Sequence, residues 1–172
     1  KLCLIQMALP GAGEAVLIDP IDGPEMSMEP LYDLFRHEPT VKVFHAARQD
    51  LEIFFVEGNV FPTPLFDTQI AAMLCGYDDQ IGYGALVESI TGHKLPKLHT
   101  RADWETRPLP PDQLHYAEDD VRYLRDVYLF LKQKRDDLSA SLEGDLSARH
   151  LFVLGHIHAH IETLQREIAE ID

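Results

Sequence analysis

Tyr116 and Asp120 stand four residues apart in a segment, Leu114 to Leu124, that reads as a helix. Residues four apart share one helix face, so the phenol and the carboxylate are predicted to be neighbours. An apolar stripe runs beside this pair and comprises Leu114, Ala117, Val121, Leu124, Tyr128 and Leu131. Such a pair suits metal-assisted hydrolysis. It also suits an ordinary hydrogen-bonded pair at a core edge, which is the more frequent arrangement for an isolated Tyr-x-x-x-Asp.

Three other sets of polar residues have both a chemical and a structural interpretation. Asp67 directly precedes a predicted helix, Gln69 to Leu74, and this position favours an N-cap over a catalytic acid. Asp19 precedes Pro20 at a strand end, which is typical of a turn. His156 and His160 have the i, i+4 spacing of metal ligands, but without a third ligand a solvated polar face is favoured.

Length and charge limit the classes of function. A chain of 172 residues is long enough for one domain with a short appendage. The net charge of −14 argues against general binding of polyanions unless metals and a local basic patch meet the phosphates. One such patch lies between Lys94 and Arg107, with Lys97, Arg101 and the only tryptophan, Trp104. Phosphate contact and an ordinary solvated loop both remain open for it.

The cysteines and the apolar runs bear on location. Cys3 and Cys75 lie far apart without ligand-like spacing, which predicts reduced thiols and a cytoplasmic protein. The apolar runs are too short to span a membrane, and no signal peptide is visible. Because the sequence begins at Lys1 inside a strand-like run, we expect the natural N-terminus to lie upstream.

The order of elements predicts an α/β fold with a mixed sheet flanked by helices. The first two strands are expected to form a hairpin through Pro10 to Gly13. A helix capped by Ser27 should bury Leu31, Leu34 and Phe35. The remaining predicted elements are a strand at 41–44, a helix at 48–56 ended by a left-handed Gly58, a helix at 81–90, and the helix that begins after Pro110.

Composition changes near Lys134, so we expect a domain at 1–134 and a polar linker with an amphipathic C-terminal helix at 135–172. The stripe of that helix is heptad-like and comprises Ile157, Ile161, Leu164, Ile168 and Ile171. It would pack on the domain or form a homodimer with a second copy.

Three segments in order resemble the ribonuclease D family of 3′→5′ exonucleases, which use four acidic residues and a tyrosine. These segments are Val43 to Phe54, Pro64 to Gln69, and Arg101 to Trp104 running into Tyr116 to Asp120. The opening strands match the same family, so the resemblance covers about residues 1 to 134. As an ordered set the motifs are specific, although each alone is weak.

The resemblance implies a ribonuclease H-like fold and two-metal phosphodiester hydrolysis with two Mg²⁺ ions, or Mn²⁺ in their place. By position, Asp50 and Asp120 match catalytic metal-ligand acids, and Tyr116 matches the tyrosine that orients the attacking water. His45 is implied to line the site. Lys97 and Arg101 are implied to contact nucleic acid, with RNA 3′ ends, as in tRNA and other structured RNAs, preferred over DNA.

One motif of the family has no counterpart in this sequence. The Asp-x-Glu motif that supplies two of the four acids precedes the segment matching Lys1 to Gln6, and Glu14 and Asp19 fall in the wrong elements to replace it. We therefore expect an N-terminally truncated domain with little nuclease activity in this 172-residue chain. Two alternatives remain: an inactive exonuclease-like module that binds nucleic acid or protein, and a dimerising fragment.

Overall fold

The computed structural model describes residues 2–9, 15–23, 25–96 and 102–141. The chain divides into two compact units, residues 1–133 and 134–172. The elements below belong to the first unit, except that the last helix continues into the second and ends at Ser141. The predicted heptad stripe, His156 and His160 lie outside the described residues.

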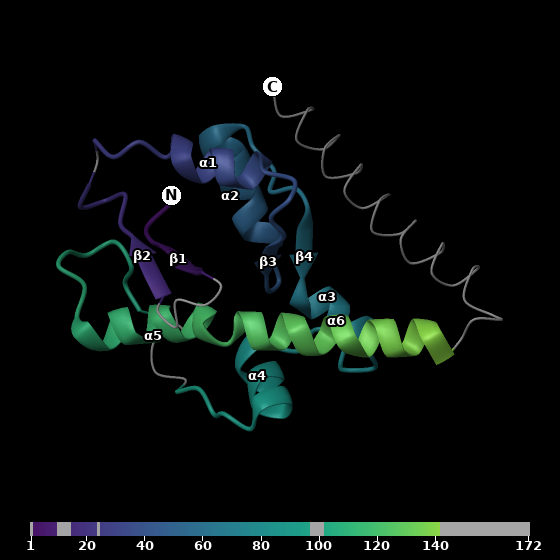
Figure 1. Ribbon diagram of the computed structural model, residues 1–172. Coiled ribbons are helices and arrows are strands. Elements are labelled where there is room, and N and C mark those ends of the chain that lie inside the picture. Colours follow the sequence, from purple (N-terminus) through teal and green to yellow (C-terminus); the bar gives the residue numbers. More distant parts are fainter. Residues whose placement is uncertain (1, 10–14, 24, 97–101, 142–172) are drawn as a thin grey trace. The chain divides into compact units, whose positions relative to one another are not determined.

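The strands form two separate pairs (Figure 1). Strand β1 (Ile5–Ala8) pairs antiparallel with β2 (Ala15–Ile18), which confirms the predicted hairpin pairing. Strand β3 (Lys42–Phe44) pairs in parallel with β4 (Leu65–Asp67). One mixed sheet was expected. The described residues instead form one antiparallel and one parallel pair, and no strand lies between β1 and β3 to join them.

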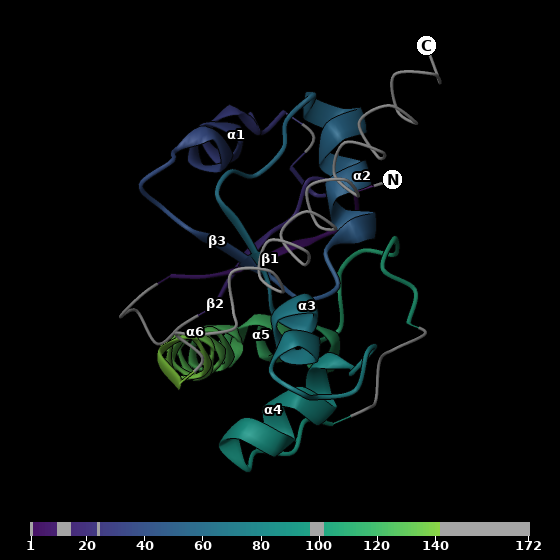
Figure 2. The ribbon, with the colours of Figure 1, turned by 90° about the vertical axis from the view of Figure 1, so that its right-hand side faces the viewer.

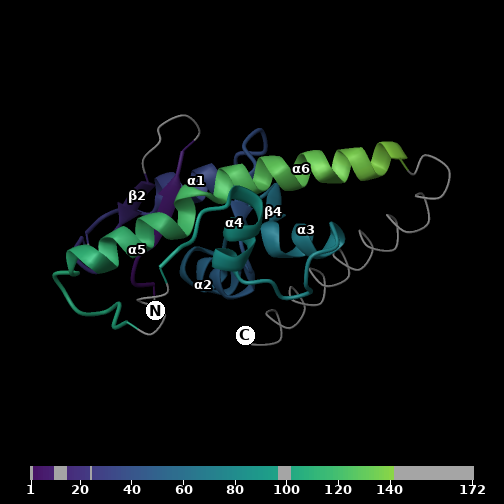
Figure 3. The same cartoon turned by 90° about the horizontal axis from the view of Figure 1, so that it is seen from below.

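Six helices are described, and their bounds are α1 (Glu29–Arg36), α2 (Arg48–Gly58), α3 (Thr68–Leu74), α4 (Tyr83–Thr91), α5 (Pro111–Arg122) and α6 (Leu124–Ser141). Figure 1 shows α1 and α2 on one side of the strands, with α5 and the start of α6 on the other. Seen from below, α5 and α6 follow one another across the strands (Figure 3). Helix α6 occupies the start of the predicted polar linker because no Gly or Pro interrupts it before Gly144.

Two helix ends differ from the predictions. Gly58 is the last residue of α2, and Asn59 adopts the left-handed conformation with φ of 47°. A glycine is still required at position 58, because a Cβ there would overlap the ring of Tyr32. Met28 occupies the N-cap position of α1, and the Ser27 hydroxyl accepts the backbone N–H of Glu29 at 3.3 Å.

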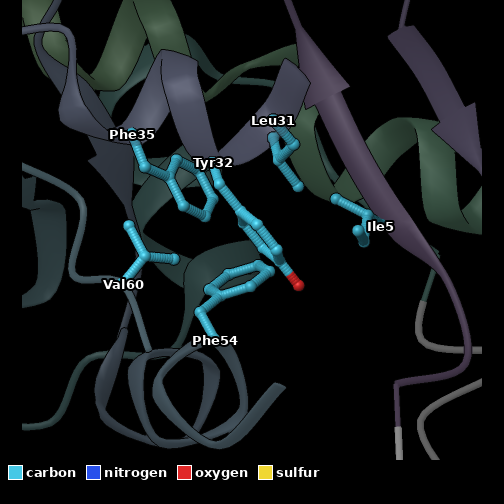
Figure 4. Packing of buried hydrophobic residues seen from close by; sticks show 6 residues of the cluster. All are labelled: Ile5, Leu31, Tyr32, Phe35, Phe54 and Val60. Carbon is cyan, nitrogen blue, oxygen red and sulfur yellow. The ribbon is translucent and has the colours of Figure 1, made fainter. Parts of the chain in front are cut away.

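Two apolar clusters hold the first unit together. One joins α1, α2 and β1, where Phe35 and Phe54 meet edge to face at 4.7 Å (Figure 4). Its buried members are Ile5, Leu31, Tyr32, Phe35, Phe54 and Val60. The other joins α3, α4 and α6 through Ala72, Cys75, Leu86, Val87, Val127 and Leu131. Among the helices that the structure describes, none is long and apolar enough to cross a membrane.

Candidate active site

An open cavity of about 560 Å³ lies between β1 and β3, and both predicted metal-ligand acids line it. In Figure 2, β1 and β3 lie next to each other, with α1 and α2 above and α5 and α6 below. Asp50 reaches the cavity from the first turn of α2 and Asp120 from the last turns of α5. The structure therefore brings together two carboxylates that are 70 positions apart in the sequence (120 − 50).

The remaining cavity wall is mostly apolar and comes from the facing strands and from α6. From β1 and its flanks it includes Leu4, Ile5, Met7 and Leu9, and from β3 and its flanks it includes Val41, Val43 and Phe44. Among the described residues, the edge of β1 opposite β2 and the edge of β3 opposite β4 have no strand partner. The cavity is thus an apolar slot with two carboxylates in its lining and a strand edge without a partner on each side.

Asp67 fixes the turn that sets Asp50 in place. Its carboxylate accepts the backbone N–H groups of Ala46 at 3.1 Å and Ala47 at 2.8 Å, just before α2 begins. Ala46 has a φ of 54°, a left-handed conformation that costs a non-glycine residue about 1–2 kcal/mol. These hydrogen bonds offset that cost and fix the direction in which α2 starts.

The same carboxylate caps the next helix. Asp67 is the N-cap of α3 and accepts the N–H of Gln69 at 2.8 Å, so the predicted N-cap is confirmed. The sequence pattern gave no sign of its second role at Ala46 and Ala47. An aspartate before an apolar-periodic helix indicates a cap, but only the parallel pairing of β3 with β4 carries that aspartate to the start of α2.

Tyr116 lies one helical turn before Asp120 on α5, as the spacing predicted. The fully buried Ala117 faces the core beside this pair and fixes the rotation of the helix. Tyr116 also faces the Trp104 ring, with centroids 6.2 Å apart and ring planes at 38°. The Tyr116 ring therefore lies next to the loop that precedes its own helix, one turn before Asp120.

Comparison with known proteins bears on this constellation of acids and a tyrosine. A family model described as a 3′-5′ exonuclease matches residues 1–136, which include Asp50, Tyr116 and Asp120. The chain belongs to this 3′-5′ exonuclease family. Ribonuclease D of Jannaschia sp. (strain CCS1) is 54% identical over 151 residues, or 86% of this chain and 39% of that protein. Ribonuclease D of Bartonella henselae is 51% identical over 78% of this chain and 32% of that protein.

Solved structures agree with this assignment. Escherichia coli RNase D, described as an exoribonuclease involved in structured RNA processing, has a TM-score of 0.73 and 33% identity over 90% of this chain and 40% of its own. Brucella melitensis NrnC with bound Mg²⁺ has a TM-score of 0.69 and 29% identity over 82% of this chain and 69% of its own. This ribonuclease D-like domain thus has a mixed α/β fold, and it spans about two fifths of the first relative's length.

Electrostatics at the cavity of the exonuclease domain favour the neutral form of its acids. Burial raises the pKa of Asp120 to about 6, with a further contribution from the charge of Asp119. Burial also raises the pKa of Asp50, and the charge of Asp67 adds to it. The Asp50 side chain is solvent-accessible because the cavity is open, but the surrounding protein still displaces much of its hydration. A nearby cation would stabilise the ionised form of both carboxylates.

Burial also shifts the pKa values of Tyr116 and His45, which lie near these acids. Burial, followed by the charge of Asp120, raises the pKa of Tyr116. Burial lowers the pKa of His45, which favours the neutral ring. The His45 Nε2 donates to the Ile81 carbonyl at 3.1 Å, and its Nδ1 lies 2.9 Å from the Thr68 hydroxyl. His45 lines the cavity, and both of its ring nitrogens are bonded inside the protein. Its contact with nucleic acid stays a prediction.

Tyr83 is a cavity residue that the sequence did not single out. It begins α4, lies 5.6 Å from the His45 ring, and its hydroxyl is 3.4 Å from the Asp119 carbonyl. Burial and then the neighbouring acids of α5 raise its pKa, so it remains a neutral phenol. A tyrosine in the first turn of an apolar helix carries no distinguishing pattern, and only the packing of α4 against α5 places it here.

The predicted basic loop lies only partly within the described residues. Lys97 and Arg101 fall outside them, and their contact with nucleic acid stays a prediction. Among the residues that the structure does describe, no group of three or more His, Cys, Asp or Glu side chains is arranged to hold a metal ion. Asp50 and Asp120 are ligands of the right chemical type for Mg²⁺, but two carboxylates are fewer than a two-metal site requires.

Proposed function

We propose that this domain is the catalytic part of a 3′→5′ exoribonuclease that hydrolyses RNA from the 3′ end, in tRNA and other structured RNAs. The observation that carries the proposal is the convergence of Asp50 and Asp120 on one cavity, with Tyr116 one turn from Asp120. The family match and the ribonuclease D relatives support it, including the E. coli enzyme described as acting in structured RNA processing.

The proposal assigns a separate role to each predicted site residue. Asp50 and Asp120 would hold Mg²⁺ through carboxylate oxygens, with Mn²⁺ as a substitute, and Tyr116 would orient the attacking water. Two such ions, when bound, activate water and stabilise the leaving 3′-oxygen. His45 would line the pocket for the terminal nucleotide, and Lys97 and Arg101 would contact its phosphates. RNA rather than DNA is proposed because the ribonuclease D relatives are ribonucleases.

The cavity also indicates how the site would be completed. We propose that a strand carrying an Asp-x-Glu motif fills the slot between β1 and β3, joining the two pairs into one ribonuclease H-like mixed sheet. Its apolar side chains would replace solvent against Ile5, Val43 and Phe44, and the unpaired edges would gain backbone hydrogen bonds. Its carboxylates would lie at the end of the slot, beside Asp50 and Asp120.

Activity of purified protein tests both statements. We expect the 172-residue chain to trim a 5′-labelled RNA little or not at all with Mg²⁺ or Mn²⁺. The same chain extended upstream of Lys1 by a strand with an Asp-x-Glu motif should shorten it from the 3′ end, and Asp120→Asn should abolish this. Trimming by the unextended chain that Asp120→Asn removes would contradict the proposed impairment. An extended chain that binds Mn²⁺ but leaves RNA intact would contradict the exonuclease proposal.

An inactive binding module is the second candidate, because the described residues offer fewer than three grouped metal ligands. Calorimetry separates the two: heat on addition of Mn²⁺ favours the enzyme, whereas its absence in the extended chain favours the module. Sedimentation would then test a homodimer formed through the C-terminal helix. A cytoplasmic location is proposed because Cys3 and Cys75 stand far apart in the sequence without ligand-like spacing.

A further inference from the structure

Arg107 has an arrangement of contacts that the exonuclease proposal does not use. Its guanidinium makes a two-point contact with Asp19, from Nε at 2.5 Å and from Nη2 at 2.7 Å. Nη2 also donates to the Cys3 carbonyl at 2.7 Å, and Nη1 donates to the carbonyls of Trp104 at 2.9 Å and Thr106 at 3.0 Å. An arginine has five N–H groups, and all five are engaged.

These contacts fasten the loop before α5 to the hairpin. Asp19 lies directly after β2, and Cys3 lies just before β1. In the sequence, Asp19 is 88 residues and Cys3 is 104 residues from Arg107. The side chains are mostly covered, with 14% of Arg107 and 28% of Asp19 exposed. Asp19 also accepts the backbone N–H groups of Ile21 and Asp22, as its predicted turn role requires. A carboxylate with this many donors is fixed in position.

Trp104 is the part of the loop that this contact places. Its carbonyl is bonded to Arg107, and the preceding Asp103 closes the turn by accepting the Glu105 N–H at 2.9 Å and the Thr106 hydroxyl at 2.7 Å. The indole then faces the Tyr116 ring on α5, and α5 itself packs on β1 and β2. The hairpin thus holds both sides of the aromatic contact, the helix directly and the loop through Arg107.

We propose that Asp19 and Arg107 are positioning residues that hold Trp104 against Tyr116 and thereby fix the tyrosine beside Asp120. Neither residue touches the cavity, and both act through the aromatic pair. The aromatic contact stands on the observed geometry. Its consequence for the orientation of the attacking water rests on the proposed function, whereas the physical test below does not require activity.

Trp104 is the only tryptophan of the chain, so fluorescence excited selectively at tryptophan reports on it alone. In the 172-residue protein, we expect Arg107→Met to make quenching of this fluorescence by acrylamide about twofold stronger, because the loop is released from the hairpin. Arg36→Met is the matched control: it removes an arginine that pairs with Glu29 and Asp33 on the surface of α1. This control should leave the quenching unchanged.

A double-mutant cycle separates a positioning role from general stability. In a Tyr116→Ala background, Arg107→Met should change the quenching by less than about half of its effect in the native sequence, because the ring that Trp104 faces is gone. Equal effects in the two backgrounds would overturn the proposal, as would native quenching in a folded Arg107→Met protein. If Arg107→Met does not fold, Arg107→Lys and Asp19→Asn replace it. Arg107→Lys keeps the charge but loses the planar fork.

Discussion

The two acidic regions of this domain treat their carboxylates in opposite ways. At the hairpin, the hydrogen bonds from Arg107 hold the pKa of Asp19 below its usual value. At the cavity, burial raises the pKa of Asp120 to about 6 and also raises that of Asp50. A carboxylate surrounded by donors stabilises the fold, whereas one that is partly desolvated beside other acids is costly until a cation or a proton arrives.

The comparison separates the acids that hold the fold together from the acids that are proposed to bind a ligand. Asp19 and Asp67 each accept several backbone or guanidinium hydrogen bonds, and both hold loops together. Asp50 and Asp120 instead line one open cavity, where a ligand can reach their side chains. The same residue type therefore performs either task, and the number of donors around it distinguishes the two.

The largest expected effect is on activity at the cavity. Asp50→Asn in the strand-extended protein should lower kcat/KM by about 1,000-fold, equivalent to roughly 4 kcal/mol of transition-state stabilisation. The free energy of unfolding should change little. Glu52→Gln, which removes an exposed acid from the same helix, is the control and should retain activity. Comparable kcat/KM values for Asp50→Asn and Glu52→Gln would contradict the assignment of Asp50 to the active site.

A large effect on stability is expected at Asp67. Asp67→Ala removes the cap of α3 and the acceptor for Ala46 and Ala47, so the free energy of unfolding should fall by about 3 kcal/mol. Urea unfolding followed by circular dichroism measures this loss. Replacing Asp112, an exposed acid in the first turn of α5, by Ala is the comparison and should cost well under 1 kcal/mol. Equal losses would mean that the turn before α2 does not depend on Asp67.

Asp19→Asn should have a smaller effect that depends on pH. Because the folded pKa of Asp19 is lowered, its ionised form stabilises the protein above the unfolded pKa, and this is lost as the pH falls through the folded value. We expect the variant to lose about 2 kcal/mol at pH 7, and the difference from the native protein to shrink below about pH 4. Urea midpoints at several pH values measure it. A loss that stays constant down to pH 2.5 would contradict the role of the charge.

The smallest effect is expected at Asp120, with the opposite sign. The pKa of Asp120 is about 6 in the folded protein, which is higher than in the unfolded chain. The protonated acid therefore contributes stability at pH values below the unfolded pKa, and this stability is lost as the pH rises through about 6. Without metal, Asp120→Asn should stabilise the protein by about 1 kcal/mol at pH 8, a figure reduced for solvent screening, and by nothing at pH 3.5. If Asp120→Asn instead destabilised the protein at pH 8, the ionised Asp120 carboxylate would have to be stabilised by hydrogen-bond donors, as that of Asp19 is.

Much of the fold followed from local sequence. The hairpin pairing, the cap at Asp67 and the helix before Gly92 depend on periodicity, turn residues and capping, which act within a few residues. The left-handed position after α2 was predicted one residue too early, at Gly58 instead of Asn59, because Gly58 serves the approach of Tyr32 and not the left-handed turn. Close packing between elements leaves no local pattern from which to predict it.

The sequence alone determined the family and predicted the three residues of the proposed active site. Asp50, Tyr116 and Asp120 occur at spacings that the ordered motifs identify, and a helix places residues four apart on one face whatever surrounds them. Only the tertiary structure decided that the two acids meet in a slot between β1 and β3, that Tyr83 joins them, and that Arg107 ties Trp104 to the hairpin. Those facts depend on contacts between residues far apart in the chain, which no local pattern contains.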